Sequence, residues 1–342
     1  MPPLRVINAA APIRICDNGG WTDTWVARRG KVFNIGVRPL VVVRLEVFSR
    51  GSRDARVVIN ARNYGFRYAP ALDQPEWGPH PLLEAALHAI PPPDDVDIEA
   101  IIHSTAPAGA STGTSAAVVV ALLGALDKLT GGCRTVNEIA NEAHAVETTR
   151  LGRQCGVQDQ LCSAFGGINF IDIVDYPRAV VSRLDLADET RRELGRRLVL
   201  IYLGRSHSSS AVHEIVMRDL ERLGPECAQL DALRVAAEKA RDAVLAGDFE
   251  ALGVAMRCNT DAQADLHADL VQREARRVIE IGAAHGAIGW KVNGAGGDGG
   301  SITLLAGARA ATKRAMIRAI TQENSAFTSI PIAISRAGLR VW

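Results

Sequence analysis

Short apolar runs, some alternating with polar residues, fill most of the first hundred positions and predict β-strands. The run over residues 39–48 is rich in β-branched valine, which favours strands. A helical period replaces this pattern over residues 81–90 and stops at Pro91-Pro92-Pro93. We predict strands over residues 5–15, 31–35, 39–48, 56–60, 63–68 and 96–105, the fourth and fifth of which form a hairpin.

Helical and strand patterns alternate in the rest of the chain. A loop over residues 106–112 leads into a long apolar helix near Thr114, and helices follow over residues 135–149 and from about Val157. Strands are predicted over residues 168–173, 179–184 and 198–203, with a charged stretch at 185–197. Later helices are expected over residues 209–223, 231–246, 249–264 and 269–285, and later strands over 290–293, 301–305 and 330–334. The pattern indicates an α+β protein with two domains, residues 1–195 and 196–342.

Composition narrows the class of protein. Hydrophobic residues make up 47% of the 342 positions and charged residues 23%, which is typical of a soluble globular chain. Lys and Arg number 39 against 38 Asp and Glu, so no bulk charge favours a nucleic acid or an anionic membrane as partner. The most apolar stretch, residues 116–126, is about half a membrane span. Residues 1–5 lack the pattern of a signal peptide. We therefore expect a cytoplasmic protein.

The segment over residues 107–117 has the composition of an anion-binding turn. Gly109 and Gly113 allow a close approach of the backbone to a ligand, and Thr114 and Ser115 stand where N-cap hydroxyls belong. Free N–H groups and the helix dipole favour an anion at such a helix start. A plain loop that caps a buried helix is the alternative. The lysine of a Walker A loop is absent.

A second glycine-rich segment covers residues 291–300. Gly294, Gly296 and Gly299 satisfy G-x-G-x-x-G, but a strand pattern follows where a dinucleotide-binding fold needs a helix. A tight hairpin turn is the structural interpretation. Five glycines within residues 294–300 exceed what a hairpin needs, which favours a loop pressed against a ligand or against another loop.

Two carboxylates are candidates for chemistry in the middle of the chain. Glu147 lies on the predicted helix over residues 135–149, and Asp159 lies at the start of the next helix. Each has an ordinary interpretation as a solvated or capping residue. Beside an anion-binding helix start, they would instead supply a magnesium ligand and a proton acceptor.

In this order, the segments resemble the motifs of the GHMP kinase superfamily. Residues 107–117 resemble its phosphate loop, P-x-G-x-G-L-G-S-S-A-A, with Ser111 and Thr112 as departures. Residues 291–300 resemble the third motif, which Asp298 interrupts. Ala11-Pro12-Ile13-Arg14 and Gly19-Gly20-Trp21-Thr22-Asp23 resemble the first motif in the form typical of sugar 1-kinases. Residues 143–167 are similar to the heptose-7-phosphate kinase and fucokinase branch.

The resemblance implies a fold and a nucleotide site. The expected fold is the α+β two-domain GHMP kinase fold, with an N-terminal domain like domain 2 of ribosomal protein S5 and a ferredoxin-like C-terminal domain. The expected ligands are ATP and Mg²⁺, bound in the cleft between the domains. Ser115 and Glu147 would hold Mg²⁺. The residues expected around the ATP phosphates are Pro107, Gly109, Ser111, Gly113, Thr114 and Ser115.

The resemblance also implies an acceptor site. Asp159 would accept or orient the proton of the attacking hydroxyl, and Arg14 would lie near the transferred phosphoryl group. Asp23, with Gly20 and Thr22, would bind sugar hydroxyls. The remaining residues expected on the substrate side are Gly204, His207, Gly294, Gly296 and Gly297. His207 stands where an arginine is usual, which argues against a phosphorylated sugar unless His207 serves in its place.

These features predict an ATP-dependent kinase that acts on the anomeric hydroxyl of a small-molecule sugar or sugar phosphate. D-glycero-D-manno-heptose 7-phosphate is the first candidate acceptor, and L-fucose or another free hexose or uronate is the next. A mevalonate-type diphosphate decarboxylase and a non-catalytic binding protein of the same fold remain alternatives. A homodimer is compatible with the family.

Overall fold

The long strands β1 (Arg5–Asn18) and β2 (Gly30–Ser49) are neighbours inside the larger sheet and pair antiparallel over most of their length. The computed structural model describes residues 2–62, 65–72, 74, 76–107, 109–205 and 210–342. β5 (Val96–Ser104) pairs with β2, and β3 (Val57–Ala61) and β4 (Phe66–Tyr68) continue the sheet. β6 (Ile168–Asp175) pairs with the other half of β2, and β7 (Arg178–Arg183) pairs with β6.

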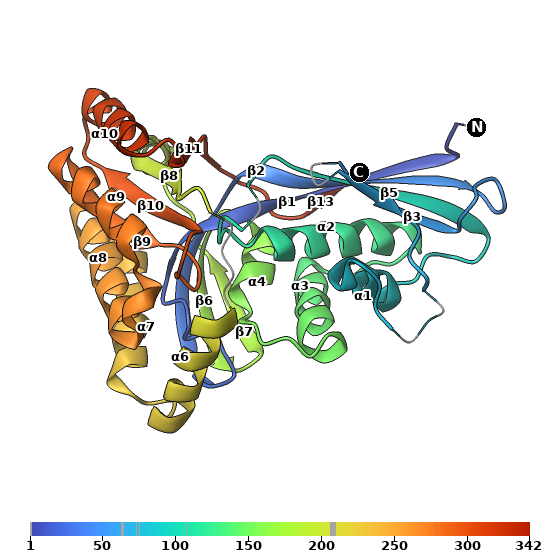
Figure 1. Cartoon of the computed structure of the whole chain (residues 1–342), viewed down its shortest axis with the longest axis horizontal. Coiled ribbons are helices and arrows are strands. Elements are labelled where there is room, and N and C mark those ends of the chain that lie inside the picture. The colour runs from blue at the N-terminus through green and yellow to red at the C-terminus, as the bar shows by residue number, and fades with distance from the viewer. Residues whose placement is uncertain (1, 63–64, 73, 75, 108, 206–209) are drawn as a thin grey trace.

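Helices of the first half of the chain cover one face of this sheet (Figure 1). They are α1 (Pro81–Ala89), α2 (Thr114–Leu129), α3 (Val136–Ala145) and α4 (Gln158–Phe165). The central helix, α2, is hydrophobic on nearly every side and is buried between the sheet and its neighbours. A π-helical turn, Val146–Arg150, extends α3, and such turns often mark functional sites.

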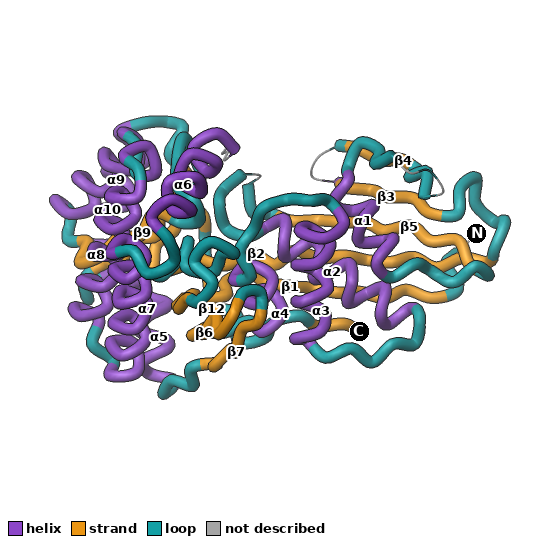
Figure 2. The backbone as a smooth tube through the Cα atoms, turned by 90° about the horizontal axis from the view of Figure 1, so that it is seen from below, coloured by secondary structure: helices purple, strands orange, loops and turns teal. Residues whose placement is uncertain are grey.

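The second half of the chain builds a smaller antiparallel sheet in the order β11 (Thr328–Ile330), β8 (Leu198–Tyr202), β10 (Ser301–Ala306), β9 (Ala287–Val292). Its helices are α5 (Asp188–Arg197), α6 (Ser210–Leu223), α7 (Ala228–Ala246), α8 (Phe249–Leu266), α9 (Arg273–Ala284) and α10 (Ala310–Glu323). A short 3₁₀ turn, Ala268–Leu270, precedes α9. Figure 2 shows these helices gathered at one end of the molecule, with the long strands running to the other.

The end of the chain returns to the first sheet. β12 (Ala333–Ile334) pairs with β2, and β13 (Arg340–Val341) pairs with β1. One buried apolar cluster also continues from the strands and helices of the first half into α7, α8 and β8. The boundary that we proposed between residues 195 and 196 therefore divides the sequence into two parts. In the structure, the shared apolar core and the strands β12 and β13 join these parts.

The sequence patterns located most elements, and three differences have physical causes. The strands expected over 31–35 and 39–48 form the single strand β2, because a bulge at Arg38–Pro39 accommodates the proline without ending the pairing with β1. The segment 330–334 is divided between β11 and β12, which belong to different sheets. The charged stretch 185–197 contains α5, which buries Leu194 alone.

Candidate active site

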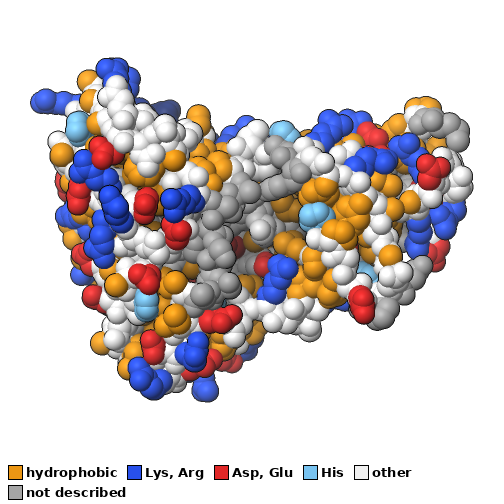
Figure 3. Space-filling view, in the orientation of Figure 1, with side chains coloured by type: hydrophobic (Ala, Val, Ile, Leu, Met, Phe, Trp, Pro, Cys, Tyr) orange, Lys and Arg blue, Asp and Glu red, His pale blue; other side chains and the backbone are white. Residues whose placement is uncertain are grey.

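A cleft of about 870 Å³ lies where the two halves of the molecule meet, and Figure 3 shows the surface hollowed there. Residues from β1, the loop before α2, the segment leading to α4, helix α6 and the β9–β10 loop all line it. Eleven of the sequence-predicted site residues are among them: Arg14, Gly20, Asp23, Gly109, Ser111, Gly113, Thr114, Ser115, Glu147, Asp159 and Gly294.

The loop between β5 and α2 forms one wall of the cleft. Gly113, with φ +67°, is the N-cap of α2, and no side chain caps the helix start. Thr114 and Ser115 are consequently the first helical residues and not the N-caps that the sequence suggested. The N–H groups of this first turn point towards the cleft end of the helix without a side-chain partner, which is the arrangement that binds phosphate. The hydroxyl-bearing Ser115 is exposed there.

Arg14 and Asp159 form an ion pair beside this loop. Arg14, at 4% exposure, donates from Nε to Asp159 Oδ1 at 2.7 Å and from Nη2 to Oδ2 at 3.3 Å. Its Nη1 donates to the carbonyl of Ser111 in the phosphate loop. Burial alone would lower the pKa of Arg14, but Asp159 and Asp17 raise it above its ordinary value. The guanidinium therefore stays charged and fixes the orientation of the Asp159 carboxylate.

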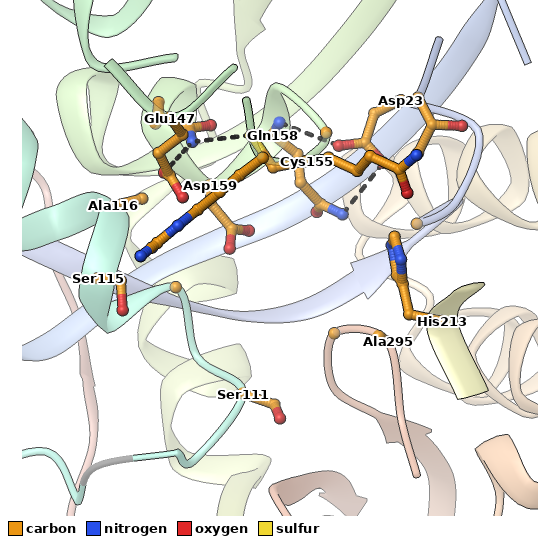
Figure 4. A pocket seen from close by; sticks show the side chains of 18 of the residues that line it. Asp23, Ser111, Ser115, Ala116, Glu147, Cys155, Gln158, Asp159, His213 and Ala295 are labelled. Atoms are coloured by element: carbon orange, nitrogen blue, oxygen red, sulfur yellow. Dashed lines mark hydrogen bonds between the residues drawn. The ribbon is translucent and has the colours of Figure 1, made fainter. Parts of the chain in front are cut away.

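Glu147 faces the cleft from the π-helical turn. Its Oε1 accepts a hydrogen bond of 2.8 Å from Nε2 of Gln160, on α4. Burial raises the pKa of Glu147, and the nearby Asp159 raises it further against the effect of the Gln160 hydrogen bond. A carboxylate in this environment gains from a cation. Figure 4 shows Glu147 and Ser115 on neighbouring walls of the same cleft.

Asp23 lies at the other end of the cleft, beside Gln158. The backbone N–H of Gln158 donates to Asp23 Oδ2 at 3.1 Å, and the Gln158 side chain lies 3.5 Å from Oδ1. Burial raises the pKa of Asp23 to about 6. Trp21 and His213 stack here with ring centroids 5.1 Å apart, and both line the cleft. Figure 4 shows His213 on the same side of the cleft as Asp23.

Trp21 has an unusual backbone for so large a residue, with φ +78°. Its side chain is buried, and its indole N–H finds no hydrogen-bond partner among the described residues. A strained backbone and an unpaired donor at one position are features of functional sites. Trp21 has both, and it lines the cleft together with Asp23.

The β9–β10 hairpin carries the glycine loop, as its strand context required. A Cβ added to Gly294 would lie 3.2 Å from Ser111 Cβ and 3.3 Å from Arg14 Nη2. Ser301 donates from its hydroxyl to the carbonyl of Ala110 at 2.6 Å. The glycine loop therefore packs against the phosphate loop. This close contact requires that residue 294 has no side chain.

The remaining predicted residues lie outside the cleft lining. Thr22 is buried and uses its hydroxyl to hold the turn, donating to the carbonyl of Gly19 at 2.7 Å. Gly296 and Gly297 pack against Leu270, Pro107 lies in the loop between β5 and α2, and Gly204 lies in the loop after β8. His207 lies outside the described residues. Asp298, the acid in the glycine loop, is exposed and pairs with Arg205 at 3.6 Å.

Several lining residues had no role in the sequence prediction: Trp21, Arg153, Cys155, Gln158, Gln160, His213 and Glu214. Trp21, Gln158 and Gln160 belong to segments that resemble family motifs. Their position beside the predicted site residues could therefore have indicated that they line the site. His213 and Glu214 come from α6, where only the packing of that helix against Trp21 brings them to the site.

Comparisons with known proteins identify the family. Residues 81–167 match the family model of the GHMP kinases N-terminal domain. The chain is 30% identical to mevalonate kinase of Pyrococcus furiosus, over 72% of this chain and 70% of that enzyme. It is 26% identical to D-glycero-alpha-D-manno-heptose 7-phosphate kinase of Campylobacter jejuni, over 58% of each protein. The crystal structure of a D-glycero-D-manno-heptose 1-phosphate kinase from Bacteroides thetaiotaomicron superposes with a TM-score of 0.75, 20% identity and 98% coverage of both chains.

The chain belongs to the GHMP kinase family, whose members transfer a phosphoryl group from ATP to an alcohol. The two-domain GHMP kinase fold expected from the sequence is confirmed by the structural superposition. In the part of the chain that the structure describes, no helix is long and apolar enough to cross a membrane.

Proposed function

We propose that this protein phosphorylates the anomeric hydroxyl of a sugar or sugar phosphate with ATP and Mg²⁺. The observation that carries the proposal is the position of the Arg14–Asp159 pair. It contacts the phosphate loop through Ser111, and the same cleft contains Asp23 at its other end. An acceptor bound at Asp23 would present its hydroxyl between a phosphate site and a carboxylate.

The residues divide the reaction between them. The acceptor oxygen attacks the γ-phosphorus of ATP, its proton passes to the Asp159 carboxylate, and ADP leaves with the electrons of the broken P–O bond. Arg14 orients Asp159 and supplies positive charge beside the transferred group. The amides at the start of α2 would hold phosphate oxygens.

The donor set suits Mg²⁺. Glu147 and Ser115 offer two oxygen ligands, and the described residues contain no group of three or more His, Cys, Asp or Glu placed so as to hold a metal ion by themselves. Mg²⁺ commonly takes one or two protein oxygens and completes its shell with water and substrate phosphates. When bound, it would neutralise phosphate charge. Gln160 would hold the Glu147 carboxylate in place for it.

The charges of the acceptor end favour a polyhydroxylated acceptor. Asp23 accepts hydrogen bonds, and Glu214 adds a second carboxylate to the lining. The described basic side chains of the cleft are Arg14, which is engaged by Asp159, and Arg153 and His213. A sugar with several hydroxyls would satisfy Asp23 directly. D-glycero-D-manno-heptose 7-phosphate is our first candidate, with Arg153 available for its phosphate, and L-fucose or another free hexose or uronate is the next.

The similarity to mevalonate kinase favours a second candidate activity, the phosphorylation of mevalonate. Mevalonate carries a carboxylate, so its site needs a cation. Mevalonate also offers Asp23 fewer hydroxyls than a sugar does, which is why we rank this candidate, and a mevalonate-type diphosphate decarboxylase, below a sugar.

An ADP-release assay with Mg·ATP tests the proposal. The panel contains D-glycero-D-manno-heptose 7-phosphate, L-fucose, D-galactose, L-arabinose and galacturonate, with mevalonate and phosphomevalonates as the off-class arm. We expect turnover on a sugar and phosphorus NMR of the product that shows an anomeric phosphate. Turnover on mevalonate alone would reject the sugar proposal. Binding of Mg·ATP without turnover on any acceptor would favour the non-catalytic alternative.

A further inference from the structure

A buried carboxylate lies directly behind the proposed catalytic pair. Asp17 is fully buried, with 0% exposure. The pairing of β1 with β2 shifts register between Ile15 and Asn18, and Cys16 has φ +56° in the same interval. Such a bulge turns a side chain out of the regular alternation of a strand. Here it aims the Asp17 carboxylate towards the C-terminal domain.

Asp17 binds the glycine loop of that domain. The N–H of Gly294 donates to both of its oxygens, at 2.9 Å to Oδ2 and 3.2 Å to Oδ1. Two cations also surround it. Lys291 Nζ lies 3.5 Å from Oδ1, and Arg14 Nη1 lies 3.8 Å from the same oxygen.

Lys291 is the partner that balances this buried charge. Its side chain is 1% exposed, and Nζ donates to Gln263 Oε1 at 3.0 Å. Gln263 in turn donates from Nε2 to the carbonyl of Gly294 at 3.2 Å. Burial lowers the pKa of Lys291, while Asp17 acts against that shift. Gly294 is thus held at its N–H by Asp17 and at its carbonyl by Gln263.

The position of Gly294 matters because it packs against Arg14 and Ser111, as described above. A shift of the glycine loop would move groups that contact both the catalytic arginine and the phosphate loop. Replacing a buried ion pair with apolar residues is often neutral for stability. Stability alone therefore gives no strong reason for the charged pair Asp17–Lys291 at this place. The need to hold the N–H of Gly294 in one position gives such a reason.

We propose that Asp17, balanced by Lys291, is a positioning residue that fixes the glycine loop of the C-terminal domain against Arg14 and the phosphate loop. That this placement aids phosphoryl transfer rests on the proposed kinase function. The placement itself does not rest on that function, because it follows from the hydrogen bonds between the Gly294 N–H and Asp17.

Two variants test this role. Asp17→Asn keeps the size of the side chain and removes its charge. The double variant Asp17→Leu/Lys291→Met replaces the pair with apolar side chains, so that no buried charge is left unpaired and the protein can fold even if Asp17→Asn does not. The matched control is Asp97→Asn. Asp97 is also 0% exposed and accepts a backbone N–H, from Arg53 at 3.2 Å, but it lies at the end of β5 remote from the phosphate loop.

The first readout is hydrogen exchange of peptides that span residues 290–300, which needs neither acceptor nor turnover. We expect the amide of Gly294 to exchange about tenfold faster in the double variant, because its acceptor is gone. Asp97→Asn should leave this peptide unchanged. Unchanged exchange in the folded double variant would overturn the proposal, whatever the acceptor proves to be.

The second readout is kinetic, on the acceptor identified by the panel. We expect kcat to fall about 10- to 100-fold in the double variant, with KM for ATP and for the acceptor within about threefold of wild type. A pair that served stability alone would regain full kcat once the apolar pair restored folding, and that result would reject a positioning role. If no acceptor in the panel is turned over, the proposed function fails while the exchange experiment still decides the role of Asp17.

Discussion

At the scale of single residues, three of the carboxylates that line the cleft differ in their surroundings. Asp159 is paired with Arg14, whereas the buried Asp23 and the half-buried Glu147 each accept a hydrogen bond from an amide. The pairing holds the Asp159 carboxylate in one orientation, as a proton acceptor requires. Burial raises the pKa of the other two, so each gains from a ligand that compensates its charge.

Replacing Asp159 with Asn tests its proposed role. We expect Asp159→Asn to lower kcat by about 10²- to 10⁴-fold, because the acceptor for the hydroxyl proton is lost. Binding of Mg·ATP, measured by calorimetry, should be retained. Asp248→Asn, which keeps an N-cap on α8, should show wild-type turnover. Full turnover of Asp159→Asn would refute the assignment of the base.

The pKa of Asp23 predicts a pH dependence of acceptor binding. Burial raises this pKa to about 6, with further contributions from the charges of Asp159 and Asp17, and the Gln158 N–H acts in the opposite direction. The carboxylate is therefore ionised above about pH 6 and protonated below it. Because the ionised form accepts hydrogen bonds from sugar hydroxyls, KM for the sugar should rise as the pH falls through 6.

Asp23→Asn is the control for this effect. It should raise KM for the sugar at neutral pH and remove the rise near pH 6, while KM for ATP stays unchanged. Steady-state kinetics between pH 5 and 8 measure both constants. A rise in KM near pH 6 that persists in Asp23→Asn would assign the titration to another group.

At the scale of elements, the start of α2 shows how a backbone conformation shapes the site. Gly113 caps the helix with φ +67°, and a Cβ there would lie 3.1 Å from Asp159 Cγ and 3.3 Å from Arg14 Cγ. The helix start and the Arg14–Asp159 pair are therefore packed against each other. A side chain at position 113 would disturb both.

Gly113→Ala and Gly131→Ala separate backbone strain from this contact. Gly131 follows the same helix with φ +73°, and nothing lies within 4 Å of its Cβ position. Each variant should lose about 1–2 kcal/mol of unfolding free energy, because alanine is strained at positive φ. Only Gly113→Ala should also lose turnover, by about tenfold or more, since a misplacement near 1 Å costs up to about 10² in rate. Denaturation curves and ADP release measure the two effects. Equal kinetics in both variants would contradict the packing argument.

At the scale of the whole molecule, the last residues tie the second half of the chain to the first. Gly167 donates from its N–H to Ser335 at 2.7 Å, and Leu339 donates to Ala164 at 2.9 Å. Ala164 belongs to α4, the helix that carries Asp159. The tail therefore supports the end of the helix that carries Asp159.

Deleting residues 333–342 should destabilise the protein as a whole. The deletion leaves backbone groups of β1, β2 and the end of α4 without partners, and each such buried group costs about 1–3 kcal/mol. We expect the thermal unfolding transition of the entire molecule to fall, as recorded by calorimetry, because the apolar core continues across both halves. Trp342→Ala removes one exposed side chain, keeps the backbone hydrogen bonds between residue 342 and Asn8, and should have a small effect. An unchanged first-half transition would show that the two parts unfold independently.

The amino-acid sequence by itself determined most helices and strands and the location of the motif loops. The hairpin of β3 and β4, the helix α2 after its glycine loop and the strand after residue 300 all follow from local patterns of apolar spacing, proline and glycine. These patterns act over a few residues, so they are visible without tertiary structure. The helix α10 was left out of our prediction, although Met316 and Ile320 have helical spacing.

Only the tertiary structure decided which of these residues meet. The pairing of Arg14 with Asp159 joins positions 145 apart in the chain, and that of Asp17 with Gly294 joins positions 277 apart. The same holds for the stacking of His213 on Trp21 and for the return of β12 and β13 to the first sheet. Such contacts depend on packing between distant elements, and local periodicity carries no information about it. Asp17 follows the strand predicted over residues 5–15, and only its burial at a strand bulge shows that it contacts the glycine loop.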